Sequence, residues 1–183
     1  MKKTITIVAI LLLAASSAFA QATATGKTNL NLSVANEANI SITTTNTTLS
    51  SGATPFTDYT GTTNYTYQIR TSSAGTGSIT LLITTDFSAG GGGSPSVANP
   101  PTAGDKLTFT CTAAVGTACS SAQTASTTVA ATAVGFGGNA HAGTPGSVVS
   151  NGAAGSVSWD FTNDPAYPVG SYQAVATFTI SAT

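Results

Sequence analysis

Residues 64–86, NYTYQIRTSSAGTGSITLLITTD, decide the fold class of this 183-residue chain. Apolar side chains occupy every second position on both sides of the turn-forming segment 74–77. They are Tyr65, Tyr67 and Ile69 before the turn and Ile79, Leu81 and Ile83 after it. Such alternation is typical of strands that bury one face, and the glycines between them favour a tight turn. The segment therefore predicts two consecutive β-strands.

The same alternation recurs along the chain, and no segment has a sustained helical period. Further strands are predicted within residues 30–42, 107–111, 126–134, 157–161 and 171–181. Turn-forming residues lie between the predicted strands, at 50–52, 135–138, 143–146 and 165–170. Seven or eight short strands punctuated in this way predict an all-β fold, an immunoglobulin-like antiparallel β-sandwich. A closed barrel is the alternative.

The composition excludes several classes of function. Charged residues make up 6% of the chain, and beyond residue 20 only three are basic and six are acidic. A nucleic-acid-binding surface needs a cluster of cations that this chain does not have. One His, one Met and one Trp leave little material for a redox, metal or acid–base site. We therefore expect a protein that is not an enzyme and holds no cofactor. A calcium site in the loops that carry aspartates is left open, although no run has the ligand spacing of an EF-hand.

The first 20 residues, MKKTITIVAILLLAASSAFA, have the layout of a secretory signal peptide. Two lysines precede an apolar run, and small residues end in an A-x-A site that predicts cleavage between Ala20 and Gln21. The apolar run is shorter than the roughly 20 residues of a membrane span. We expect export through the inner membrane to the cell surface, with no membrane span after signal removal.

The two cysteines, Cys111 and Cys119, are eight positions apart in a chain expected to reach an oxidising compartment. These conditions favour a disulfide, which would contribute roughly 2.5 kcal/mol on the chain-entropy estimate. A metal pair is the alternative, but the only histidine, His141, lies in a Gly/Ala-rich stretch. No nucleophile elbow or orienting carboxylate lies near His141, so we interpret it as a surface-loop residue without a catalytic role.

The segment 30–42 alternates for longer than an ordinary strand of five or six residues. One interpretation is two consecutive strands of one sandwich that break near Asn36 and Glu37. The other is that residues 21–34 form an extension whose Leu30, Leu32 and Val34 complete the sheet of a neighbouring copy. We therefore divide the chain into a signal peptide (1–20), an N-terminal extension or donor strand (21–34) and a sandwich domain (35–183).

The C-terminal segment VGSYQAVATFTISAT, residues 169–183, places five residues on one face of the last predicted strand. With the signal peptide, the alternating N-terminal segment and the Thr- and Gly-rich sandwich, it resembles bacterial pilins of the chaperone–usher type. It also resembles the related secreted domains similar to spore coat protein U. The resemblance is a pattern over most of the chain, and only the last dozen residues are motif-like.

This resemblance implies a fold that lacks one strand. A periplasmic chaperone would cover the vacant position, and the extension of the next subunit would replace it at an outer-membrane assembly pore. Leu30, Leu32 and Val34 would be the donor residues. The acceptor groove or terminal strand would contain Tyr172, Ala174, Ala176, Phe178 and Ile180. The expected function is a secreted subunit that polymerises with itself into a surface fibre, and a C-terminal donor strand fits the alternation almost as well.

A different class of function is a soluble or surface-bound adhesin or carbohydrate-binding module. Its ligand, such as a surface glycan, would be held by the predicted loops at 88–104 and 135–146. A second glycan site is conceivable where Asp160, Asp164 and Tyr167 surround Trp159. The alternation of Trp159 with Val157 and Phe161 favours a core position for this tryptophan instead.

Overall fold

The computed structural model describes residues 25–87, 93–143 and 152–183, and the chain divides into two compact units, 1–33 and 34–183. In the first unit, residues 25–33 have no regular secondary structure. Leu30 and Leu32 are 91% and 88% exposed there. The predicted signal peptide and its cleavage site at Ala20 and Gln21 lie outside the described residues.

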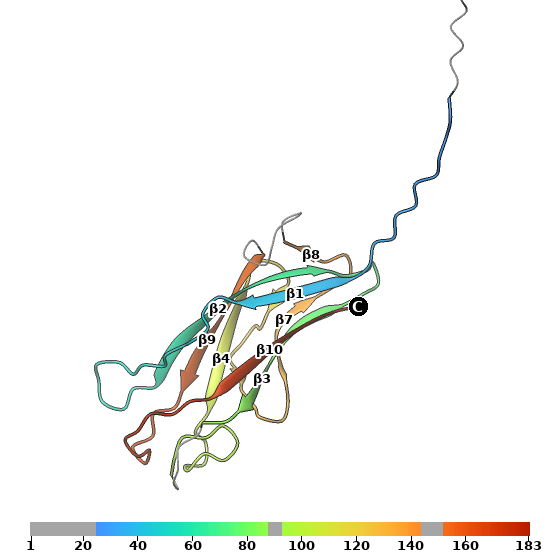
Figure 1. The fold of residues 1–183 in the computed structure, drawn as a ribbon. Coiled ribbons are helices and arrows are strands. Elements are labelled where there is room, and N and C mark those ends of the chain that lie inside the picture. The colour runs from blue at the N-terminus through green and yellow to red at the C-terminus, as the bar shows by residue number, and fades with distance from the viewer. Residues whose placement is uncertain (1–24, 88–92, 144–151) are drawn as a thin grey trace, which may run out of the picture. The chain divides into compact units, whose positions relative to one another are not determined.

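The second unit is a sandwich of two antiparallel sheets (Figure 1). Sheet A has the order β1 (Glu37–Ile42), β2 (Tyr59–Arg70), β9 (Ala153–Phe161), β4 (Leu107–Ala113) and β6 (Gln123–Thr124), and β8 (His141–Ala142) also pairs with β2. Sheet B has the order β10 (Val175–Ala182), β3 (Gly77–Thr85), β7 (Ala131–Phe136) and β5 (Thr117–Ala118). The all-β sandwich is therefore confirmed and the closed barrel is not formed. The immunoglobulin-like topology stays a prediction. None of the described residues belongs to a helix that is long and apolar enough to cross a membrane.

Alternating side chains from both sheets form the core, as the sequence predicts. Tyr65, Tyr67 and Ile69 of β2 and Ile79, Leu81 and Ile83 of β3 are at most 3% exposed. Trp159 is 6% exposed, and its ring nitrogen donates a hydrogen bond of 2.8 Å to the Thr63 hydroxyl. Gly155 lies opposite Tyr65 in the strand register, and a Cβ at this glycine would come within 2.5 Å of the Tyr65 ring. A glycine is therefore required where this tyrosine crosses β9.

The strand within the alternating run 30–42 begins at Glu37, where a break is predicted, and the described residues 30–36 form no strand. Other predicted boundaries are wrong. The predicted turn at 135–138 begins later because β7 continues through Phe136. The terminal strand begins at Val175, which leaves Tyr172 and Ala174 outside it. The Tyr172 hydroxyl donates a hydrogen bond of 2.6 Å to the Pro168 carbonyl, so the chain is still turning at this point.

The strand connections lie at two opposite ends of the sandwich (Figure 1). The loop end consists of the connections 43–58, 86–106 and 162–174, as far as they are described. The base end consists of the turn 71–76 and the segment 137–143, and it includes the start of β1 and the end of β10. β1 therefore runs from the base end to the loop end, and β10 runs in the opposite direction.

Candidate functional site

One lateral edge of the sandwich is formed by β1 of sheet A and β10 of sheet B. Both are the last strands of their sheets, and in the described part of the chain β1 pairs only with β2 and β10 only with β3. Half of the main-chain donors and acceptors of an edge strand point away from its partner. The edge is therefore able to accept a further strand.

The inner face of β10 is covered less completely than that of its neighbour β3. In β3, the inward-facing Ile79, Leu81 and Ile83 are at most 2% exposed. In β10, the inward-facing Ala176, Phe178, Ile180 and Ala182 contact the core but remain only half-buried. The two strands are paired residue by residue, so the difference comes from what covers their inner faces and not from their alternation.

A cavity of about 540 Å³ opens at the loop-end half of this edge. Its apolar lining comes from both sheets and includes Ile42, Leu49, Ile83, Phe87, Leu107, Trp159, Ala174, Val175, Ala176 and Phe178. Its polar lining includes Thr44, Thr47, Thr63 and Tyr172. The volume lies within the range of binding pockets in proteins, and the lining favours an apolar side chain over a charged one. We call the inner face of β10, the facing side of β1 and this cavity the edge groove.

Hydrogen bonds hold one wall of the edge groove in place. Directly after β1, the amides of Thr43 and Thr44 both donate to the carbonyl of Asn64, at 2.9 and 3.1 Å. The hydroxyls of Thr47 and Thr63 are 2.6 Å apart. These contacts tether the segment 43–49 to β2 and keep it over the cavity.

The far end of the cavity is ordered by Asp86, which follows β3. Its carboxylate accepts hydrogen bonds from the Ser96 hydroxyl and from the amides of Phe87, Val97 and Ala98, at 2.6 to 3.0 Å. Burial alone raises the pKa of this carboxyl, but the four hydrogen bonds together outweigh burial and hold it below its usual value. The described part of the predicted long loop, 93–104, is thus attached at its start to the end of β3.

The structure brings most of the predicted acceptor residues together. Tyr172, Ala174, Ala176 and Phe178 line the cavity, and Ile180 lies further along the same inner face of β10. The predicted donor residues Leu30, Leu32 and Val34 are all exposed. Sequence reasoning missed the opposite wall, Ile42 and Leu49, although Leu49 is conspicuous as the only large apolar residue in a run of threonines.

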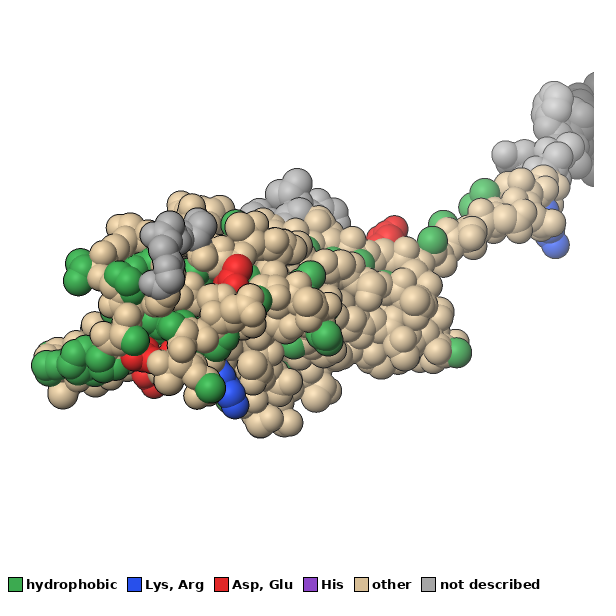
Figure 2. Space-filling view, turned by 90° about the horizontal axis from the view of Figure 1, so that it is seen from below, with side chains coloured by type: hydrophobic (Ala, Val, Ile, Leu, Met, Phe, Trp, Pro, Cys, Tyr) green, Lys and Arg blue, Asp and Glu red, His purple; other side chains and the backbone are tan. Residues whose placement is uncertain are grey.

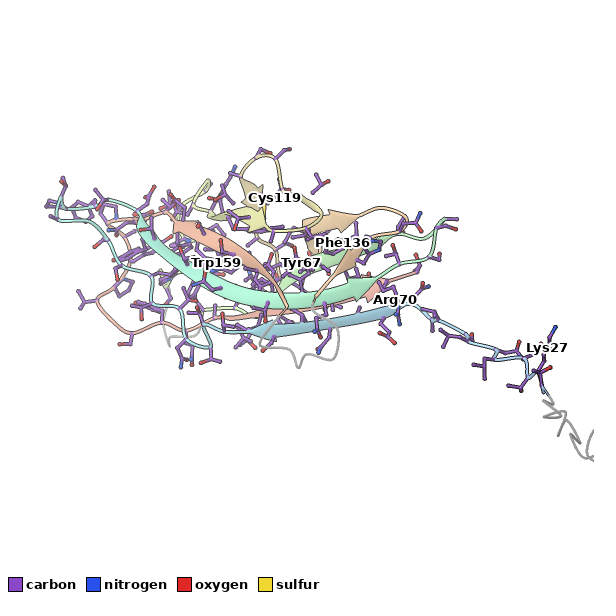
Figure 3. All side chains as sticks on the ribbon, turned by 90° about the horizontal axis from the view of Figure 1, so that it is seen from above. Lys27, Tyr67, Arg70, Cys119, Phe136 and Trp159 are labelled. Atoms are coloured by element: carbon purple, nitrogen blue, oxygen red, sulfur yellow. A yellow bond between two sulfur atoms is a disulfide. The ribbon has the colours of Figure 1, made fainter. Side chains whose placement is uncertain are left out.

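The opposite lateral edge is closed by a covalent bond. The predicted disulfide joins Cys111 of β4, in sheet A, to Cys119, which follows β5 of sheet B. The Cys119 amide donates to the Ala133 carbonyl at 3.0 Å. Nearby, the Tyr67 hydroxyl donates to the Val115 carbonyl and accepts from the Val115 amide at 2.9 Å. Figure 3 shows Tyr67 between Trp159 and Phe136, with Cys119 on the same side of β2.

The predicted glycan site around Trp159 is not present as a platform, because this tryptophan is buried. Tyr167 stacks on Phe161 with a centroid distance of 5.8 Å, and its hydroxyl donates to Asp105 at 2.7 Å. Burial, followed by the hydrogen bond and charge of Asp105, raises the pKa of Tyr167. His141 is exposed, as predicted, but it pairs with Arg70 as part of β8. Within the described ranges, no three His, Cys, Asp or Glu side chains gather in a way that could hold a metal ion.

Comparison with known proteins adds no assignment: no family model matches this chain, and no curated protein or solved structure matches it significantly.

Proposed function

We propose that this chain is a secreted structural subunit that polymerises into a bacterial surface fibre by strand exchange. In this proposal, residues 25–34 of one copy occupy the edge groove of another copy. The observation that carries the proposal is the edge groove itself. One side of β10 has no strand partner in the described residues, and the inward apolar side chains of β10 are only half-buried beside an apolar cavity. The same chain has exposed Leu30, Leu32 and Val34 at alternate positions.

The lengths of the two segments agree. Ten residues in extended conformation reach about 34 Å, whereas the eight residues of β10 span about 27 Å. A segment of residues 25–34 would therefore pair along the whole of β10. Burial of the three apolar side chains would contribute about 5 to 9 kcal/mol before the cost of ordering the segment. The main-chain hydrogen bonds of a new strand pair would add to this stabilisation.

The pairing would be antiparallel to β10. Every strand pair in the described residues is antiparallel, including the pairing of β10 with β3. A donor strand in this orientation has Val34 at the loop end, where the cavity lies. Leu32 or Val34 would then fill the cavity, and Leu30 would cover the half-exposed face near Phe178 or Ile180.

Export through the inner membrane, a periplasmic chaperone and an outer-membrane assembly pore belong to the same proposal. An uncovered apolar groove favours aggregation during export. A carrier that covers it until the next subunit arrives would prevent this. The signal-like residues 1–20 support export, and the low charge of the chain favours close packing of copies because little charge must be desolvated.

The proposal is tested by replacing Leu30 and Leu32 with Asp in the full chain. We expect the domain to fold, but we expect no filaments in material sheared from cells and no ladder on an unboiled gel. The matched control is Asn29→Asp with Asn31→Asp, which adds the same charge to the other face of the same segment. This control should still polymerise. Filaments formed equally well by both variants, or a monomeric wild type, would contradict strand exchange.

A soluble adhesin is the second candidate, and one observation favours it. The outer face of sheet A has a shallow depression of about 400 Å³ lined by hydroxyl groups and one carboxylate. They belong to Thr60, Thr62, Thr108, Thr110, Ser158 and Asp160. Side chains of this kind can hydrogen-bond a sugar, although the neighbouring aromatic rings of Phe109 and Trp159 are buried. A monomeric wild type that binds glycans, with binding lost in Asp160→Ala, would support this function.

A further inference from the structure

We propose that the loop end of each subunit is a docking surface for the base end of the next copy in the fibre. This inference rests on the proposed strand exchange, and it adds a second contact between copies besides the donor strand. The contact residues on the loop end are Phe56 and Val169. The partner is a second copy of this chain, through its turn 71–76 and the segment 137–143.

Two large apolar side chains stand exposed at the loop end. Phe56 is 62% exposed and Val169 is fully exposed. Figure 2 shows hydrophobic side chains gathered at this end of the sandwich, beside acidic and basic side chains. Exposed aromatic and aliphatic groups at loop tips are typical of contact surfaces and are unfavourable in water.

The loops that carry these side chains are held in fixed positions. The Thr57 hydroxyl accepts a hydrogen bond from the Gly52 amide at 2.8 Å and donates one to the Thr54 carbonyl at 3.0 Å. The Asn163 amide donates to the Asp58 carboxylate at 3.0 Å, and its side chain donates to the Thr57 carbonyl at 2.9 Å. The bonds of Asn163 join the loop containing Phe56 to the start of the loop containing Val169.

The backbone of Phe56 is strained. Its φ angle is +60°, a conformation that costs a bulky residue on the order of 1 kcal/mol or more. Phe56 takes this angle as the third residue of a β-turn after Pro55, in which the Thr57 amide donates to the Thr54 carbonyl at 3.4 Å, and the turn leaves its ring exposed. Strain of this kind concentrates at functional sites, and a contact with another copy gives the ring a role.

The connection between donor segment and domain is short. Only Ala35 and Asn36 separate Val34 from the start of β1. Arg70 fixes this connection, because its Nε donates to the Ala35 carbonyl at 3.0 Å and its guanidinium pairs with Glu37 at 2.8 Å. Figure 3 shows Arg70 where β1 begins.

This short connection brings the two copies into contact. With the donor strand antiparallel to β10, Val34 lies at the loop end of the acceptor. The donor's β1 then begins at most about 10 Å further on. Phe56 lies four residues from Thr60, which forms a bridge with Ser50 at the start of the loop. Four extended residues span up to about 13 Å. The acceptor's loop tips are therefore long enough to reach the donor's base end.

The base end has a surface that an apolar tip can approach. The exposed residues of its turn 71–76 and segment 137–143 are small or polar and include Ser72, Ser73, Ala74, Thr76, Gly137, Gly138, Asn139 and His141. Its two segments are joined, because the Asn139 amide donates to the Ser72 carbonyl at 2.9 Å and Thr71 donates to the Gly137 carbonyl at 2.8 Å. Phe56 and Val169 would meet a preformed surface in which the charges of Arg70 and Glu37 already pair with each other.

The test uses a photo-cross-linking amino acid, p-benzoylphenylalanine, in place of Phe56 in filaments of the full chain. After irradiation, mass spectrometry should find links from position 56 to residues 71–76 or 137–143 of another copy. The matched control carries the same amino acid at Thr110, which is exposed in the middle of β4, and should not give these links. In a second experiment, Phe56→Ser with Val169→Ser should retain the unboiled-gel ladder but give filaments that bend more sharply.

Three results would overturn the inference. Filaments whose links from position 56 fall on strand faces of another copy would leave strand exchange intact and remove the proposed contact. Links confined to the same copy would do the same. The absence of both filaments and ladder in the wild type would remove the proposed function and this inference together.

Discussion

The two lateral edges of the sandwich are built in opposite ways. At the edge formed by β4, β5 and β6, the Cys111–Cys119 disulfide joins the two sheets, and both polar functions of the Tyr67 hydroxyl are used by Val115. At the edge formed by β1 and β10, no covalent bond joins the sheets in the described residues, and apolar side chains border a cavity. In the proposed fibre, the open edge is the side that the extension of another copy fills.

This difference separates stability from assembly. Changes at the closed edge should alter the free energy of unfolding without altering how copies recognise one another. Changes at the open edge should alter assembly first. The predictions that follow test this separation.

The largest expected effect comes from filling the open edge within one chain. We expect that a second copy of residues 25–34, attached after Thr183 through a tight turn, gives a monomer. The turn directs the added strand antiparallel to β10. The free energy of unfolding of this monomer should be several kcal/mol higher than that of the wild-type domain, because the added strand buries its apolar side chains in the edge groove. Urea denaturation and gel filtration measure both properties. An appended copy with Leu30→Asp and Leu32→Asp is the control, and equal stability of the two fusions would refute the groove as a strand acceptor.

The next effect concerns the disulfide of the closed edge. Replacing Cys111 and Cys119 together with Ser should lower the free energy of unfolding by roughly 2.5 kcal/mol, because the unfolded chain loses a loop constraint. Denaturant titration measures this loss. Filaments should still form at temperatures where the variant is folded. A variant that folds but does not assemble would show that the closed edge also takes part in assembly.

The sequence predicts the core well because alternation reports which side of a strand faces inward. It identifies Tyr65, Leu81 and Trp159 as buried, and all three are. Alternation does not report how completely other side chains cover an inward face. Ile180 in the open edge therefore has the same sequence pattern as Ile83 in the centre. The difference between these two isoleucines arises from strand order, which is a long-range property of the fold.

Two other features of the candidate site depend on contacts that sequence spacing does not reveal. Tyr172 matches the strand pattern, but its hydrogen bond to Pro168 belongs to a turn. Asp86 is visible in the sequence at a strand end, whereas its partners are mainly backbone amides up to twelve residues away. Because any residue type supplies such amides, no side-chain motif marks this contact.

A smaller effect compares two tyrosines on the same strand. Tyr67→Phe should lower the free energy of unfolding by about 1 kcal/mol, because the half-buried amide and carbonyl of Val115 lose their partner. Tyr65→Phe is the matched control, since the Tyr65 hydroxyl is buried without a hydrogen-bond partner among the described residues. That substitution should be neutral or stabilising. Equal losses in the two variants would mean that ring packing, and not the hydroxyl contact, holds the segment around Val115.

The same two tyrosines predict a loss of stability in alkali. Burial, with a smaller contribution from the charge of Tyr67, raises the pKa of Tyr65 to about 12 from its usual value of 10.0. The folded state therefore holds this proton more tightly than the unfolded state, and the resulting stability is fully present below pH 10. It should be lost as the pH rises from 10 towards 12. Denaturant titration of the wild type and Tyr65→Phe measures it, and parallel pH profiles would contradict the assignment to Tyr65.

The smallest effect is expected in acid and comes from the border of the open edge. Hydrogen bonds lower the pKa of Asp86 in the fold, so its contribution to stability is present above the unfolded value of about 3.8. It should be lost as the pH falls through the lower, folded pKa. Asp86→Asn keeps the shape of the side chain but removes this titration, so its stability should vary less with pH in this window. Because Asp86 accepts hydrogen bonds from the amides of Val97 and Ala98, these amides should lose protection against hydrogen exchange in acid, relative to their intrinsic rates, before the core opens. Simultaneous exchange of the loop and the core would show that this border unfolds together with the sandwich and is not a separate element of the open edge.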